Sequence, residues 1–139
     1  MSQYLRFRTG DFRFLLSLEA IVEIGAVVAG DDTGGRRLWR EQALPVLDLA
    51  AWLGAPLARR AQQLVLSEAD ALHLVDIDEV EGLMELEEGQ FVRITEVSPA
   101  LAALVDAVAA EAGVCLLRLR QPLAWQPGLA GGTPAENPT

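Results

Sequence analysis

Apolar and polar side chains alternate in short runs near the start of the chain. Residues 4–8 alternate, residues 9–11 are Thr-Gly-Asp and favour a turn, and residues 12–18 alternate again. A period of two places successive side chains on opposite faces of a strand. The pattern predicts a β-hairpin whose second strand has one core face and one outward face. The core face comprises Phe12, Phe14, Leu16 and Leu18, and the outward face comprises Arg13 and Ser17.

The residues that follow predict further short elements. A single helical turn fits residues 19–24, Gly25 then breaks it, and the small apolar residues 26–29 predict a strand. Within residues 38–47 we expect two strand pieces separated near Pro45. Proline lacks the N–H that a sheet ladder needs, so an edge or a bulge is expected there.

Capping residues mark a short helix in the middle of the chain. Asp48 is an N-cap acceptor in front of residues 49–53, and Gly54 follows as a C-terminal stop. Alternating and β-branched positions then predict more strands, the first two of which form a hairpin around a polar turn. These strands are expected at residues 62–66, 72–77 and 80–86.

The segment from residue 99 to residue 110 has two local interpretations. Ser98-Pro99 is a good helix start, and Leu101, Leu104, Val105 and Val108 have helical spacing. Local pattern therefore favours a helix to about residue 110, but a strand is the alternative. After Gly113, residues 114–120 are apolar enough for a buried strand.

Composition narrows the class of protein. Eight to ten short strands and brief helices, counted along the sequence, favour an all-β barrel-type fold over a parallel α/β sheet. A chain of 139 residues that is 51% hydrophobic is one domain with a core of its own. Residues 127–139 are rich in Gly and Pro, and we expect a disordered tail there.

Charge and cysteine content exclude several partners. The formal charge is −9, from 20 acidic and 11 basic side chains, which repels nucleic acid and anionic membrane surfaces. No run of about 18 apolar residues predicts a membrane span or a leader. Cys115 has no second cysteine and lies among apolar residues, so we expect a buried, inert thiol and a cytoplasmic location.

Candidate catalytic residues are few. His73 is the only histidine and has no ligand-spaced partner, so a structural or surface role is expected rather than metal binding or base catalysis. Gly34-Gly35 is not followed by Lys-Ser or Lys-Thr, and no serine lies in a Gly-x-Ser-x-Gly context. We expect no catalytic residue, cofactor or metal, and therefore a binding module rather than an enzyme.

One acidic run and one tryptophan are the remaining candidates. The acidic run is interpreted as a solvated face or a partner-binding patch, with a carboxylate-dependent metalloenzyme as a remote alternative. Trp39, beside Arg36, Arg37 and Arg40, is either part of a recognition surface or a core residue with solvated arginines around it. The acidic run consists of Asp76, Asp78, Glu79, Glu81, Glu85, Glu87 and Glu88.

The order of these segments resembles the CheW-like domain of bacterial chemosensory systems. The resemblance covers Tyr4 to about Trp125, and no short motif is decisive alone. It includes the first hairpin with Ile-Val-Glu-Ile after it, the segment Leu-Pro-Val-Leu-Asp-Leu at residues 44–49, and Ile-Asp-Glu-Val-Glu-Gly at residues 77–82. The chain departs from the family at two usual glycines, which are replaced by Glu41 and Leu74.

The resemblance implies fold, partners and a surface. It implies two intertwined five-stranded SH3-like β-barrels over residues 1–126, with a helix no longer than residues 99–103 followed by a hairpin. It also implies a non-catalytic adaptor that couples a CheA-like histidine kinase regulatory domain to the cytoplasmic tip of a methyl-accepting chemoreceptor. The expected contacts lie in a groove between the barrels, at Val27, Val28, Leu38, Trp39, Arg40, Leu44 and Val46.

A second hypothesis concerns the same fold with a different assembly. A degenerate CheW-like module would self-associate through exposed edge strands, or would serve a pilus-type or other nonflagellar signalling assembly. The identity of the receptor, of the kinase and of the pathway depends on a few surface side chains, which the pattern does not specify.

Overall fold

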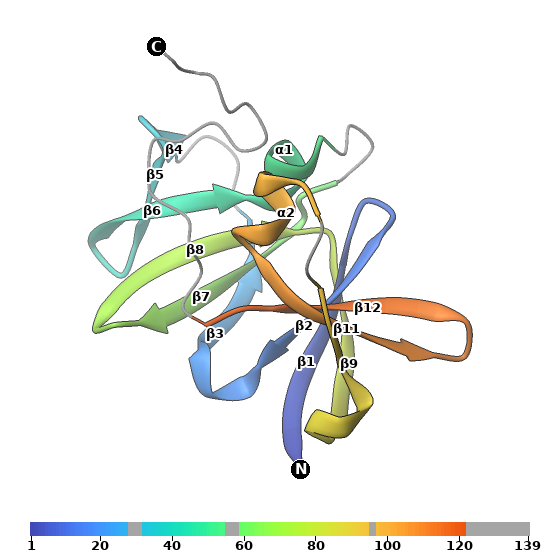
Figure 1. Ribbon diagram of the computed structural model, residues 1–139. Coiled ribbons are helices and arrows are strands. Elements are labelled where there is room, and N and C mark those ends of the chain that lie inside the picture. Colours follow the sequence, from blue (N-terminus) through green and yellow to red (C-terminus); the bar gives the residue numbers. More distant parts are fainter. Residues whose placement is uncertain (28–31, 55–58, 95–96, 122–139) are drawn as a thin grey trace.

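The computed structural model describes residues 1–27, 32–54, 59–94 and 97–121 (Figure 1). Strands predominate, and the helices are single turns. In chain order the elements are β1 (Ser2–Thr9), β2 (Phe12–Ser17), the 3-10 turn η1 (Leu18–Ala20), β3 (Ile21–Ala26), β4 (Asp32–Thr33), β5 (Arg36–Trp39), β6 (Gln42–Asp48), α1 (Leu49–Leu53), β7 (Gln62–Glu68), β8 (Ala71–Ile77), β9 (Glu79–Leu86), the 3-10 turn η2 (Glu88–Gln90), β10 (Val92–Arg93), α2 (Pro99–Ala102), β11 (Val105–Glu111) and β12 (Val114–Leu119).

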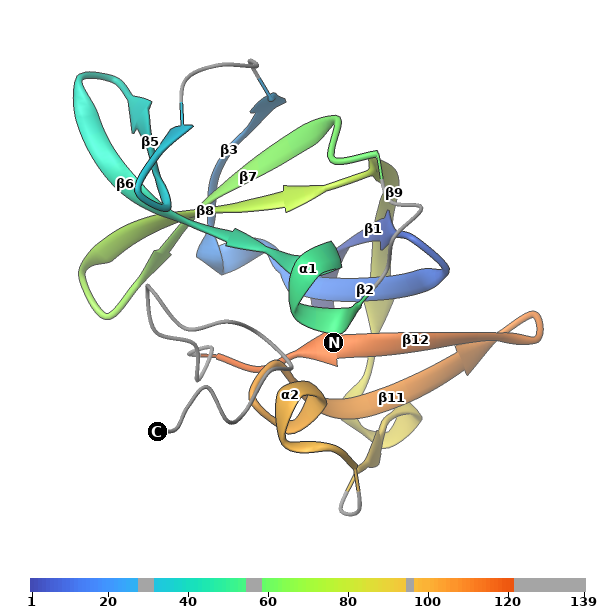
Figure 2. The ribbon, with the colours of Figure 1, turned by 90° about the horizontal axis from the view of Figure 1, so that it is seen from above.

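The strands form two curled sheets, called here the first and the second sheet (Figures 1 and 2). The first has the order β10-β11-β12-β2-β1-β9, and the second has the order β3-β7-β8-β6-β5-β4. The chain starts in the first sheet, builds the second and returns to the first at β9, so the two units are intertwined. The all-β prediction is confirmed. Each sheet has six strands rather than five over the described residues, because the two-residue strands β4 and β10 are added at an edge.

Three apolar clusters explain the long apolar runs in the sequence. The largest lies between the sheets, where Phe14 and Leu16 of the first sheet meet Leu64 and Val75 of the second. A smaller cluster lies inside the curl of each sheet, one around Tyr4 and Leu15, the other around Trp39, Leu44, Val65 and Leu74. Strands such as β2 are therefore buried on both faces. The predicted core face of β2 is confirmed, but its opposite face also buries Leu15.

Several elements form where local sequence signals predict them. The Asp48 carboxylate accepts the N–H of Ala51 at the start of α1, and Gly54 ends this helix with a φ of 68°. The first hairpin, β1–β2, and the second, β7–β8, pair in antiparallel register around two-residue turns. The shorter helix at Pro99 followed by the hairpin β11–β12 is also confirmed, because pairing along both strands outweighs local helix propensity.

Three predictions from local pattern are wrong. The helical turn covers Leu18–Ala20 only, and the strand begins at Ile21 and runs through Gly25. The chain reverses at Arg40 and Glu41 rather than near Pro45, which lies inside β6. The pairing of β5 with β6 determines where the turn lies. Pro45 does not interrupt β6, because the strand pairs with β5 up to Pro45 and with β8 from Val46 onward.

The third wrong prediction concerns the position of Cys115 in its strand. Cys115 was expected to be buried, but it is exposed on β12, while its neighbour Leu116 is fully buried. Successive side chains of a strand point to opposite faces, and the apolar run places Leu116 rather than Cys115 in the core. The expected disordered tail at residues 127–139 lies outside the described residues.

Candidate functional site

The surface expected from the sequence maps to the second sheet. Leu38 and Arg40 point outward from the β5–β6 hairpin, and 63% of Leu38 is exposed. Trp39 and Leu44 are buried in the cluster inside the curl of this sheet, with Val46 packed against it. Val27 is partly buried at the end of β3, and Val28 lies outside the described residues.

Trp39 and Arg40 join two strands that are not paired with each other. The Trp39 indole N–H donates to Glu23 Oε2 at 3.3 Å, and Arg40 contacts Glu23 Oε1 at 2.6 Å. The Arg40 guanidinium also lies over the Trp39 ring, 4.5 Å from its centre. Glu23 belongs to the edge strand β3, and the other two residues lie at the end of β5, so these contacts connect β3 to the β5–β6 hairpin. Trp39 is therefore a core ring with a polar edge, whereas Arg40 is available to solvent.

A buried ion pair lies inside the second sheet beside the Trp39 cluster. Arg37 donates to both carboxylate oxygens of Asp76, at 2.7 and 2.8 Å, and to Gln63 Oε1 at 2.8 Å. All three residues are buried. The pair links β5, β7 and β8, and two parallel N–H···O bonds impose a specific geometry. Arg37 and Asp76 thus help to fix the second sheet and are not a surface for a partner.

Asp78 joins the first sheet to the second. Its carboxylate accepts backbone N–H groups from Gly10, Arg59 and Arg60 and a guanidinium N–H from Arg8. Burial raises the pKa of this carboxyl, but the three backbone N–H donors and Arg8 together lower the pKa below its usual value. Asp78 is therefore ionised in the fold and holds the first hairpin turn against the segment that leads into β7.

Three exposed glutamates of the acidic run form separate ion pairs, and Glu79 pairs with Arg8. Glu81 pairs with Arg6 and Arg13, and Glu88 pairs with Arg118. Hydrogen bonds from Arg118 lower the pKa of Glu88. Within residues 1–27, 32–54, 59–94 and 97–121, no three His, Cys, Asp or Glu side chains form a group suited to a metal ion. The run thus divides into two buried aspartates and five exposed glutamates.

His73 has a structural environment. Its Nε2 lies 3.7 Å from Glu68 Oε1 across the β7–β8 hairpin, and both side chains are largely buried. Burial lowers the pKa of His73, so the neutral imidazole predominates at neutral pH. The expectation of a structural or surface role agrees with this position.

Two exposed apolar side chains were not identified from the sequence. Ile24 on β3 is paired with Leu64, and Leu83 on β9 is paired with Leu5. Directly paired residues share a sheet face, so both side chains extend the faces that form the core between the sheets. They are 43% and 62% exposed because β3 and β9 are the edge strands of their sheets. No local signal separates them from core residues, since their exposure follows from strand order.

Two interlocked, curled sheets, with the chain passing from the first to the second and back, define a CheW-like all-β fold. The crystal structure of the scaffolding protein TtCheW from Thermoanaerobacter tengcongensis is similar to this chain, with a TM-score of 0.71. The match covers 86% of this chain and 88% of that chain at 13% sequence identity, so it establishes the fold. No protein-family model and no curated protein sequence matches the chain. Among the described residues, no helix has the length and hydropathy of a membrane span.

Proposed function

We propose that this chain is a non-catalytic adaptor of bacterial chemosensory signalling. It holds the regulatory domain of a CheA-like histidine kinase beside the cytoplasmic tip of a chemoreceptor, and it acts in the cytoplasm. One observation carries the proposal: the fold matches that of a scaffolding protein over nearly the whole length of both chains. Scaffolds of this kind bind through surfaces, and among the described residues no three His, Cys, Asp or Glu side chains form a group suited to a metal ion.

An adaptor needs two separate surfaces, and the chain offers two. The first extends the core between the sheets at Ile24 and Leu83, where exposed apolar side chains suit the apolar stripe of a receptor helix. The second is the outer side of the β5–β6 hairpin, where Leu38 lies between the cations Arg36 and Arg40. We assign the kinase to this second surface, which includes the exposed members of the set expected from the sequence.

Charge-introducing substitutions test the assignment one surface at a time. Leu83→Glu should abolish binding of the receptor's cytoplasmic fragment and leave kinase binding intact, and Leu38→Glu should do the reverse. Val92→Glu is the matched control, because Val92 is 67% exposed on the two-residue strand β10 and lies on neither surface. Biolayer interferometry against each partner from the same organism measures the affinities. Wild-type protein that binds neither partner would remove the adaptor proposal.

Self-association is a second candidate function, favoured by the composition of β3. This edge strand has the sequence Ile-Val-Glu-Ile-Gly-Ala, and its exposed residues include Val22 and Ile24. An exposed apolar edge pairs readily with another strand. Sedimentation velocity over a wide concentration range should then show a dimer that Ile24→Lys dissociates, and a monomer at every concentration would exclude this function.

A further inference from the structure

The first sheet has an open edge along β9. In the part of the chain that the structure describes, the backbone of residues 81–86 is hydrogen-bonded to β1 alone. The N–H of Val80 donates to Gln62 Oε1 at 2.7 Å, so the open edge begins just after this residue. An edge strand with free donors and acceptors is a template for an added strand.

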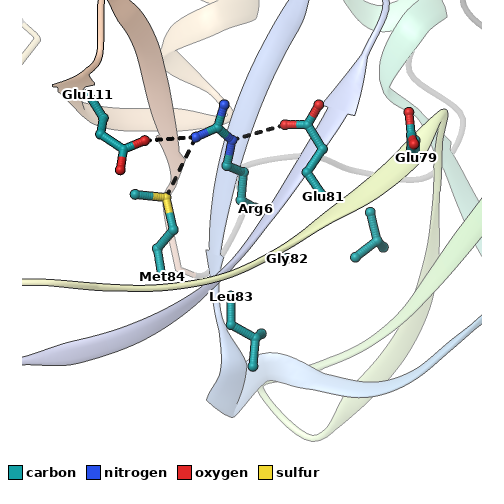
Figure 3. A pocket seen from close by; sticks show the side chains of 8 residues that line it. Arg6, Glu79, Glu81, Gly82, Leu83, Met84 and Glu111 are labelled. Carbon is teal, nitrogen blue, oxygen red and sulfur yellow. Dashed lines mark hydrogen bonds and ion pairs between the residues drawn. The ribbon is translucent and has the colours of Figure 1, made fainter.

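A hollow of about 470 Å³ lies beside this edge, on the inner side of the curled sheet (Figure 3). Its lining includes Arg6 of β1, Glu79 and Glu81 of β9, and Glu111 at the end of β11. Arg6 stands between Glu81 and Glu111, which it contacts at 2.9 and 3.0 Å. The hollow therefore separates β9 from the β11–β12 hairpin, at the seam where the first sheet does not close.

The charges around the hollow favour a cationic occupant. Arg6 is the one cation among the lining residues, against three carboxylates. The bonds of Glu79 to Arg8 and of Glu111 to Arg6 each use Oε1, which leaves Oε2 of both side chains available. Glu79 and Glu111 are also well exposed, at 60% and 52% of their side chains. Arginine or lysine side chains entering the hollow would meet these oxygens at little cost in desolvation.

The opposite face of β9 has a different chemistry. Leu83 points away from Arg6 and is exposed beside the core between the sheets (Figure 3). An added strand would therefore place alternate side chains against the carboxylates of the hollow on one face and against Leu83 and Glu85 on the other. In the described part of the second sheet, Glu23 on the edge strand β3 instead contacts Trp39 and Arg40 at the end of β5.

We propose that β9 accepts an extended segment of a partner protein in which basic and apolar residues alternate. The segment adds as a strand to the open edge, with its basic side chains in the acidic hollow and its apolar side chains beside Leu83. This interaction is separate from the proposed kinase contacts on the β5–β6 hairpin, but it shares Leu83 with the proposed receptor surface, so the segment and the receptor would compete there.

A synthetic peptide tests the proposal. The probe is a fluorescein-labelled peptide of alternating arginine and valine, eight residues long to match β9. Fluorescence anisotropy should show saturable binding to the full chain, weakened by about tenfold in the double variant Glu79→Gln/Glu111→Gln, since two exposed ion pairs are lost. The matched control, Glu19→Gln/Glu41→Gln, removes the same charge elsewhere and should bind as wild type.

Two further peptides separate strand addition from simple charge attraction. The same sequence N-methylated at alternate residues keeps its charge but lacks the donors for one edge, and it should not bind. Equal binding of this peptide, or no binding of the unmodified one, overturns the proposal. Amide chemical-shift changes should concentrate on residues 81–86. Peptide-free self-association that the Glu79/Glu111 variant abolishes would make a second copy the occupant and would also overturn it.

This outcome is independent of the kinase half of the adaptor test. The Glu79→Gln/Glu111→Gln variant retains Leu38, so kinase binding should remain when peptide binding is lost. Failure of the peptide experiment with intact kinase binding would remove only the strand-addition proposal.

Discussion

At the scale of single residues, buried carboxylates hold the fold together at defined points. Asp78 accepts four N–H groups from two separate segments, residues 8–10 and 59–60, and 1% of its side chain is exposed. Asp78→Asn removes the charge and one acceptor oxygen, and should lower the free energy of unfolding by about 2 kcal/mol, the range for hydrogen bonds to charged groups. Urea denaturation at pH 7 measures this loss. Asp70→Asn, in an exposed turn, should change stability little.

Asp78 also makes the stability of the fold depend on pH. Because the pKa of Asp78 is lowered in the fold, its contribution is complete above the unfolded pKa of about 4 and is lost as pH falls through the folded pKa. The stability difference between wild type and Asp78→Asn should therefore be constant from about pH 7 to pH 5 and shrink at more acidic pH. A difference that widens on acidification would contradict the ionised role of Asp78.

The loss of stability at the buried Arg37–Asp76 pair should differ strongly between single and double substitution. Arg37→Met leaves a buried carboxylate without its bidentate partner and should cost about 3 kcal/mol or more, whereas Arg37→Met/Asp76→Leu should recover most of this loss. A double-mutant cycle by thermal and chemical denaturation checks the pair. Equal losses in the single and double variants would indicate that packing, rather than charge, dominates.

At the scale of elements, one tight turn contains residues that its backbone conformation does not favour. Arg40 and Glu41 form the two-residue β5–β6 turn, both with positive φ, at 47° and 67°. Glycine adopts this conformation without strain and is preferred at the second position. Glu41→Gly should therefore stabilise the chain by about 0.5 kcal/mol. Gln42→Gly, in the adjoining strand, should destabilise it by a similar amount. The midpoints of urea denaturation distinguish the two directions.

The cluster inside the second sheet depends on one large side chain. Leu74 is fully buried against Trp39, Leu44 and Val65. Leu74→Ala should lose about 3 kcal/mol, because a cavity forms inside the second sheet. Calorimetric melting checks the loss; a change below about 1 kcal/mol would mean that the cluster collapses around the smaller side chain.

Elements with strong local signals could be predicted from the sequence, and those fixed by distant pairing could not. Asp48 and Gly54 define α1 within a few residues, and the alternation of residues 12–18 gives the core face of β2. The position of the β5–β6 turn depends on which strands pair, so Pro45 was misleading. The exposure of Cys115, Ile24 and Leu83 depends on strand order, which only the assembled sheets supply.

At the scale of the whole molecule, the interlocked sheets explain why one short chain presents separate surfaces. The core between the sheets ties them into one body, while each sheet keeps its own internal cluster and its own edges. The edges at β3 and β9 and the outer side of the β5–β6 hairpin remain exposed. Partner choice on such a scaffold depends on surface side chains rather than on the fold.

Sedimentation velocity of a three-component mixture tests the adaptor function most directly. The full chain is mixed with the CheA-like regulatory domain and the receptor cytoplasmic fragment from its own organism. An adaptor should give one complex containing all three proteins, and Leu38→Glu or Leu83→Glu should each reduce it to a complex of two. Sedimentation of the wild-type chain apart from both partners would contradict the adaptor function.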